Sequence, residues 1–196
     1  GEIIVHGENQ HIDNPQVAER LGIGMVHQHF KLVQVFTALE NIILGVETTK
    51  NGVLQMETAR NEVKALSEQY GLLVDLDMKI QDMQVGMQQR VEILKMLYRE
   101  SDILVFDEPT AVLTPQEIDE LMKIIQDLAD EGKSIIFISH KLKEIQTIGD
   151  RCTILRKGER IATVDVVDVT DEDLSEMMVG RKVMLRTAQG TNSPSP

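Results

Sequence analysis

A single cysteine, Cys152, occurs in the 196-residue sequence, so no disulfide can form within the chain. One cysteine suits a reducing compartment. No apolar run approaches the roughly 18 residues that indicate a membrane-spanning helix. The chain opens on Gly1 and Glu2 with no charged-then-apolar leader, so we expect no signal peptide and a piece of a longer protein. Any membrane role is then expected to come through a partner.

Basic residues are scarce: 20 Lys and Arg stand against 32 Asp and Glu, which gives a formal net charge of −12. Non-specific nucleic-acid binding needs many cations against phosphates, so this balance argues against a general nucleic-acid binder. Apolar residues make up 42% of the chain, which is enough for a sizeable core. The length indicates one domain or slightly more.

Two short apolar runs carry the prediction of fold class. Residues 103–106 and 135–138 are typical of strands buried on both faces. Between them, Thr114, Pro115 and Glu117 predict the N-cap, first-turn proline and capping glutamate of a helix. A strand, a helix and a strand at this spacing form a βαβ unit. We therefore predict an α/β fold with a parallel sheet and flanking helices.

Further elements are predicted from caps, glycines and periodicity. They are strands at 2–6 and 23–27, helices starting at Asn14-Pro15 and at Thr37, helices at 56–70 and 87–99, an antiparallel hairpin over 152–165 at the sheet edge, and a short helix at about 171–179. The last residues, 187–196, are small and polar and indicate a linker or a frayed end.

Two adjacent carboxylates, Asp107 and Glu108, follow the apolar run 103–106. In open parallel sheets, ligands bind at the carboxyl ends of the strands. One carboxylate there could hold a hard cation such as Mg²⁺, which takes one or two carboxylates plus phosphate oxygens, and the other could address a water. An acidic helix cap is the alternative interpretation of the pair.

Two more polar residues follow predicted strands. His140 comes just after the run 135–138, so it is expected at the same edge as the carboxylates, where it could contact a phosphate or orient a water. Gln28 follows the predicted strand 23–27 and could ligate a metal through its carbonyl or position a water. A surface histidine and a polar loop residue are the alternatives.

The order of these segments resembles the nucleotide-binding subunits of ABC transporters. It runs from Gln28 through MQVGMQQR (83–90) and ILVFDEPT (103–110) to His140. Two segments are similar to sequences of the simple-sugar and nucleoside importer branch: VGMQQRVEILKMLYR (85–99) and FDEPTAVLTPQE (106–117). The likeness covers residues 1–183 and leaves 184–196 as a linker or disordered tail. It implies a P-loop NTPase-like parallel sheet, a helical signature subdomain over about 37–100, and an edge hairpin.

The resemblance also implies roles for the site residues. Asp107 would hold Mg²⁺ through water, Glu108 would polarise the hydrolytic water, and His140 would contact the γ-phosphate of ATP. Gln28 would couple the metal and the attacking water to a transmembrane partner. The signature residues, which would bind the ATP of an opposing subunit in a head-to-tail dimer, are Gln84, Val85, Gly86 and Met87.

Elementary chemistry agrees with the implied signature loop. A loop that opens the predicted helix 87–99 offers backbone N–H groups and a positive helix end to a phosphate. Gly86 lets the backbone approach a ligand closely. A plain turn before a helix is the alternative interpretation of this glycine.

The sequence departs from the family pattern in two places. No Gly-x-x-x-x-Gly-Lys-[Ser/Thr] loop occurs, and Gly132-Lys133-Ser134 is instead typical of a helix end before a strand. We therefore expect an ABC domain that lacks its N-terminal Walker A part, with apolar surface left uncovered, no tight ATP binding and negligible hydrolysis by this polypeptide alone. Gln84 replaces the usual serine of the signature, which predicts weaker ATP sandwiching.

Three functional hypotheses remain open. The leading one is an ATP- and Mg²⁺-dependent energy-coupling subunit of an importer for nucleosides or simple sugars, at the cytoplasmic face of the cell membrane. Its expected partners are transmembrane permease subunits, a second ABC ATPase domain following residues 164–180, and indirectly a solute-binding protein. The alternatives are a non-catalytic permease-docking piece, and a soluble ABC ATPase acting on nucleic acid or ribosomes, which the net charge disfavours.

Overall fold

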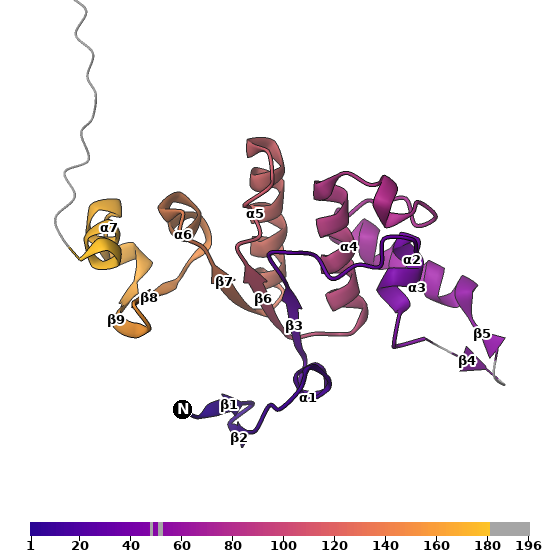
Figure 1. Ribbon diagram of the computed structural model, residues 1–196, viewed down its shortest axis with the longest axis horizontal. Helices are drawn as coiled ribbons and strands as arrows, with labels where there is room; N and C mark the ends of the chain where they lie inside the picture. Colours follow the sequence, from indigo (N-terminus) through magenta and orange to yellow (C-terminus); the bar gives the residue numbers. More distant parts are fainter. Residues whose placement is uncertain (48, 51–52, 181–196) are drawn as a thin grey trace, which may run out of the picture. The chain divides into compact units, whose positions relative to one another are not determined.

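The computed structural model describes residues 1–47, 49–50 and 53–180 (Figure 1). The chain divides into two compact units, Gly1–His140 and Lys141–Pro196, which are described separately below. The predicted linker at 184–196 lies outside the described residues. Within the part of the chain that is described, no helix has the length and apolar character needed to cross a membrane.

A three-stranded parallel sheet forms the centre of the first unit, with the strand order β3-β6-β7 (Figure 1). Its strands are β3 (Ile23–Val26), β6 (Ile103–Asp107) and β7 (Ser134–Ile138). Val26 is in register with Phe106, and Phe106 with Phe137. Helix α5 (Pro115–Asp130) joins β6 to β7. The predicted βαβ unit is confirmed, and all three strands end at one edge of the sheet.

One face of this sheet is covered and the other is open. Leu104 and Phe106 are fully buried, and helix α4 (Val85–Tyr98) lies so close to their face that a Cβ atom on Gly24 would collide with Met96. On the opposite face, Ile136 is 51% exposed. The prediction that residues 135–138 are buried on both faces is wrong, because β7 has one described neighbouring strand and no described cover over Ile136. Strand β6 is buried on one face and half-buried on the other.

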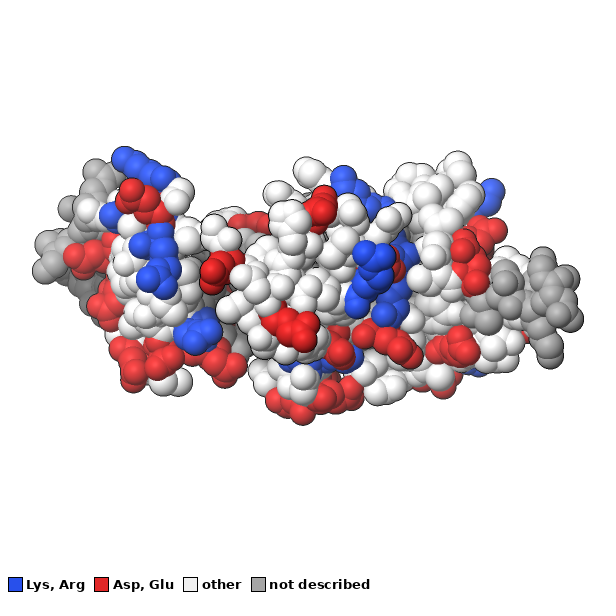
Figure 2. Space-filling model, turned by 90° about the horizontal axis from the view of Figure 1, so that it is seen from below, with Lys and Arg blue, Asp and Glu red and all other residues white. Residues whose placement is uncertain are grey.

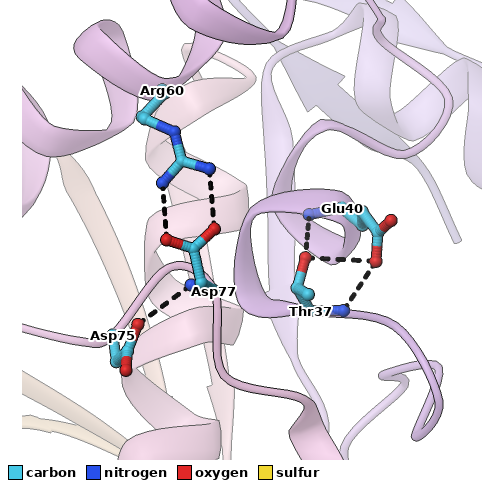
Figure 3. A network of polar contacts seen from close by, with 5 residues as sticks. All are labelled: Thr37, Glu40, Arg60, Asp75 and Asp77. Atoms are coloured by element: carbon cyan, nitrogen blue, oxygen red, sulfur yellow. Dashed lines mark hydrogen bonds and ion pairs between the residues drawn. The ribbon is translucent and has the colours of Figure 1, made fainter.

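Three helices of the first unit pack against one another. They are α2 (Ala38–Ile43), α3 (Met56–Gln69) and α4, with the 3₁₀ turn η1 (Ile80–Asp82) between the last two. Their contacts bury Ile42, Val63 and Leu94 completely. The predicted capping box of α2 is present: Thr37 Oγ1 accepts from the backbone N–H of Glu40, whose carboxylate accepts from the N–H of Thr37 (Figure 3). These helices lie within the predicted subdomain at about 37–100.

A paired arginine fixes the loop that follows α3. Arg60 donates to both carboxylate oxygens of Asp77, at 3.0 and 2.7 Å, and the backbone N–H of Asp77 donates to Asp75 (Figure 3). The Arg60 guanidinium lowers the pKa of Asp77. The backbone N–H of Ala38 donates to the carbonyl of Met78. The loop is therefore tied both to α3 and to the start of α2.

The smaller elements of the first unit are mostly local. They are β1 (Ile3–Val5), β2 (Glu8–Gln10), α1 (Pro15–Arg20), β4 (Thr49–Lys50) and β5 (Val53–Leu54). The Asn14 side chain caps α1 by accepting from the N–H of Val17, as the Asn-Pro pair predicts. Strand β1 was predicted, whereas β2, β4 and β5 were not.

The second unit holds a hairpin and two helices. Its elements are α6 (Leu142–Ile148), β8 (Arg151–Arg156), β9 (Glu159–Asp165), the 3₁₀ turn η2 (Val166–Asp168) and α7 (Asp171–Val179). The predicted hairpin and the predicted helix at 171–179 are confirmed. The hairpin strands pair with each other in a separate two-stranded sheet, not as an extension of the parallel sheet. Helix α6 was not predicted.

Candidate functional site

The predicted catalytic residues lie where the parallel strands end. Asp107 is the last residue of β6, and Glu108 follows it. His140 comes two residues after the end of β7, and Gln28 two residues after the end of β3. Because the three strands are parallel and in register, the structure places all four residues along one edge of the sheet.

Glu108 and His140 are in direct contact. His140 Nδ1 lies 2.8 Å from Glu108 Oε1. The imidazole is 68% exposed and the carboxylate 20% exposed, so the ring reaches outward from a carboxylate that is set into the surface. In either tautomer of the imidazole, Nδ1 is the atom in contact with Glu108, and Nε2 remains available to solvent or a ligand. The pair can therefore hold a ring nitrogen in a fixed direction.

The backbone of Glu108 is held in an unusual conformation. Its φ of +48° lies in the left-handed region, which non-glycine residues adopt at a cost of about 1 kcal/mol or more. Its N–H donates to the carbonyl of Ile138 at 2.9 Å, which anchors this turn to β7. Glu108 Oε2 is buried and has no hydrogen-bond partner among the described residues. An unpaired buried carboxylate oxygen fits a site that takes up a water or a hydrated cation.

The oxygen atoms at this edge are of the chemical kind that Mg²⁺ binds. Asp107 is half-buried at the end of its strand, and Gln28 is exposed. A carboxylate and an amide carbonyl are ligands of the kind that Mg²⁺ takes together with phosphate oxygens and waters. Among the described residues, no three His, Cys, Asp or Glu side chains converge on a metal position. Asp107 and Gln28 would therefore need phosphate oxygens and waters as further ligands to hold such a cation.

The predicted signature residues form the start of α4. Gln84 is the N-cap, exposed, and makes no side-chain hydrogen bond to the helix end. The helix begins at Val85, two residues earlier than predicted, so Gly86 and Met87 belong to its first turn. Val85 and Met87 are 42% and 39% exposed. The start of α4 is therefore exposed at Val85 and Met87, although the N–H of Met87 already donates to the carbonyl of Gln84.

Close packing explains why a glycine stands at position 86, and this packing could not be predicted from the sequence. A Cβ atom at this position would collide with the carboxylate of Glu117. That carboxylate accepts hydrogen bonds from the N–H and hydroxyl of Thr114, both at 2.8 Å, in the capping box of α5. These bonds lower the pKa of Glu117. The start of α4 and the start of α5 are therefore in close contact.

Comparison with known proteins identifies the family. The ABC transporter family model matches residues 1–111. The chain belongs to the ABC transporter family. It is 56% identical over 194 residues to the nucleoside import ATP-binding protein NupA of Lactococcus lactis, covering 99% of this chain and 38% of NupA. The figures for the guanosine import ATP-binding protein NupO of Bacillus subtilis are the same. The chain thus spans about 38% of the length of these curated relatives.

A solved structure of an ABC cassette has the same fold. The post-hydrolysis, dimeric structure of the ATP-binding cassette MJ0796, bound to ADP and Pi, matches with a TM-score of 0.70 and 24% sequence identity. The match covers 85% of this chain and 73% of that chain. Both the predicted family and the predicted α/β fold class are confirmed.

Two polar residues inside this ABC domain were missed in the sequence. Gln89 and Glu92 of α4 are each 3% exposed. Gln89 Nε2 donates to the carbonyl of Pro109, next to Glu108, at 2.7 Å, and Glu92 Oε1 accepts from the backbone N–H of Lys31 at 2.9 Å. The positions of Gln89 and Glu92 in the sequence do not distinguish them from surface residues of a helix. Their hydrogen-bond partners, Pro109 and Lys31, therefore could not be predicted from the sequence.

Proposed function

We propose that this chain is part of an ATP-hydrolysing, energy-coupling subunit of an ABC importer for nucleosides. The observation that carries the proposal is the contact between Glu108 and His140 at the carboxyl end of the parallel sheet. Membership of the ABC transporter family supports it, as do two relatives at 56% identity that are named for nucleoside and guanosine import.

The proposed chemistry is phosphoryl transfer to water. This reaction needs a positioned water and neutralised phosphate charge more than it needs covalent help. Glu108 accepts a hydrogen bond from the attacking water and takes up its proton, and His140 donates toward the terminal phosphate. Asp107 and Gln28 would hold Mg²⁺. The metal, when bound, neutralises charge on the phosphate oxygens.

The second half of the proposed site is the start of α4. Gln84 and the N–H groups of Val85 and Gly86 would contact the phosphates of an ATP molecule held by a second ABC ATPase domain, in a head-to-tail dimer. The exposure of Gln84 and its lack of a capping hydrogen bond support this role. A glutamine amide can donate where the family's usual serine hydroxyl donates, but over a longer side chain.

The proposed partners are permease subunits at the cytoplasmic face of the cell membrane, with a solute-binding protein acting on the permease. Simple sugars are the second candidate cargo, from the resemblance to the importer branch. Figure 2 shows basic and acidic side chains interspersed on the face that it draws. With the net charge of −12, this supports a partner other than nucleic acid.

The test is the steady-state ATPase rate of the full-length protein in complex with its permease. Glu108→Gln keeps the size of the side chain but removes the base, so we expect kcat to fall by about 10²-fold or more while ATP binding is retained. Glu68→Gln, at an exposed carboxylate of α3, is the matched control and should leave the rate unchanged. Wild-type turnover in Glu108→Gln would contradict the proposed role of Glu108.

The cargo is tested separately. Proteoliposomes that contain the complete transporter are expected to take up radiolabelled guanosine in an ATP-dependent manner and to leave xylose outside. Uptake of xylose alone would move the assignment to the sugar importers. ATPase activity without any permease, stimulated by RNA, would favour the soluble class.

A further inference from the structure

Glu92 is a carboxylate buried inside a helical packing core. Its neighbours along α4, Val91 and Ile93, are 0% and 1% exposed. A buried carboxylate is costly unless a hydrogen bond compensates for the lost water. Glu92 Oε1 accepts one from the backbone N–H of Lys31 at 2.9 Å. Packing alone would be satisfied by an apolar side chain at this position, so what distinguishes Glu92 is the hydrogen bond that it accepts from Lys31.

Lys31 lies in the irregular segment that follows Gln28. Strand β3 ends at Val26, and the segment is next fixed at Val33. There the buried side chain of Asn41 accepts from the N–H of Val33 at 2.7 Å and donates to its carbonyl at 3.1 Å. The Glu92 bond is thus the described side-chain anchor nearest to Gln28 on its C-terminal side.

Helix α4 also reaches the other carboxylate of the site. Gln89, one turn before Glu92, donates to the carbonyl of Pro109, the residue after Glu108. The same helix begins with the signature residues at Gln84. A helix is a rigid element, so a displacement of its first turn would be carried to both anchor points together.

We propose that Glu92 is a positioning residue for the Gln28 segment, and that Gln89 positions the turn of Glu108 in the same way. This inference rests on the proposed function, because Gln28 and Glu108 act there on the water and the metal. Binding of a phosphate group at the start of α4 would then be felt at both catalytic side chains through two buried hydrogen bonds of one helix.

The anchor itself is tested in this chain without nucleotide. In Glu92→Met the acceptor is replaced by an apolar side chain of similar length, so amide hydrogen exchange at Lys31 is expected to be at least about tenfold faster. In Glu92→Gln the amide oxygen still accepts, so exchange should stay slow. Gln89→Leu is the matched control on the same helix and should leave Lys31 unchanged. Equal protection of Lys31 in Glu92→Met and in the wild type would overturn the anchor.

The catalytic consequence is tested in the full-length protein with its permease. We expect kcat of Glu92→Met to fall about tenfold with the KM for ATP within about twofold of wild type, because a misplaced catalytic group slows the reaction itself. Glu92→Gln should restore kcat. A merely structural role would lower the melting temperature of both variants without this rescue. Glu92→Ala provides a second apolar variant if Glu92→Met fails to fold.

The outcomes separate the two proposals. Normal turnover in Glu92→Met, or turnover in Glu92→Gln as low as in Glu92→Met, overturns the positioning role and leaves the proposed function intact. A full-length wild-type complex with no ATPase activity overturns the proposed function and the catalytic role of Glu92 with it, whereas the exchange result at Lys31 still decides whether the anchor exists.

Discussion

Among single residues, Tyr70 has a pKa that its surroundings raise strongly. Its hydroxyl donates to Glu131 at 2.6 Å, and burial, then this hydrogen bond, raise the pKa of Tyr70 to about 12. The folded state therefore favours the protonated phenol. Its contribution to stability is present below the ordinary tyrosine pKa of about 10 and is lost as the pH rises through about 12.

The chain has two tyrosines, so this shift can be measured directly. An ultraviolet titration of phenolate formation should show an ionisation near pH 12, and Tyr70→Phe should remove that step. If the step that Tyr70→Phe removes lies near pH 10, the described contact between Tyr70 and Glu131 is not formed in solution.

Gly86 and Glu117 are expected to be coupled. Alanine generally favours a helix over glycine by about 1 kcal/mol, but a Cβ atom at position 86 collides with the Glu117 carboxylate and would push it out of its capping box with Thr114. We therefore expect Gly86→Ala to give no gain in thermal stability in the wild type. The same change should raise the melting temperature in a Glu117→Ala background. A double-mutant cycle measures this coupling, and additive effects would contradict it.

At the level of elements, the loop after α3 depends on the pair of Arg60 and Asp77. Since Arg60 lowers the pKa of Asp77, the stabilisation is present above the ordinary aspartate pKa of about 3.9 and is lost as the pH falls through the lowered value. Asp77→Asn is expected to lower the midpoint of urea denaturation at pH 7. Below the lowered pKa, wild type and variant should converge. A difference between them that stays constant with pH would show that the pair does not carry the effect.

Helices defined by local signals could be predicted from the sequence. The signals that predict them act over only a few residues, so they do not depend on the rest of the fold. Examples are the capping residues Thr37 and Thr114 and the periodicity of residues 56–70. The hairpin of β1 and β2 was only half predicted, because the polar residues 8–10 show no strand pattern. Their pairing is set by the partner strand.

The candidate site divides in the same way. The positions of Glu108 and His140 follow from apolar runs that end in a parallel sheet, so both could be predicted before any contact was known. The buried bonds of Gln89 and Glu92 join residues 20 and 61 positions apart. The packing of α4 determines these partners, so they cannot be predicted from the presence of a polar residue in the helix.

At the scale of the whole molecule, the open face of the parallel sheet is expected to govern behaviour in solution. Met25, Ile136 and Ile138 are 36%, 51% and 45% exposed. Met25 and Ile136 are both in register with Val105, and Ile138, two residues further along β7, lies on the same face. Adjacent exposed apolar side chains form a continuous apolar patch that favours association with other molecules, whereas scattered ones do not.

The patch is tested with the double variant Ile136→Thr/Ile138→Thr. Threonine keeps the β-branched shape that suits a strand, so the secondary structure should be retained while binding of an apolar fluorescent dye falls by about half and self-association at high concentration decreases. Val167→Thr is the matched control, because Val167 is 89% exposed in the second unit. Dye binding that falls equally in the control and in the double variant would show that exposed apolar residues act singly here and that the sheet face is not a continuous surface.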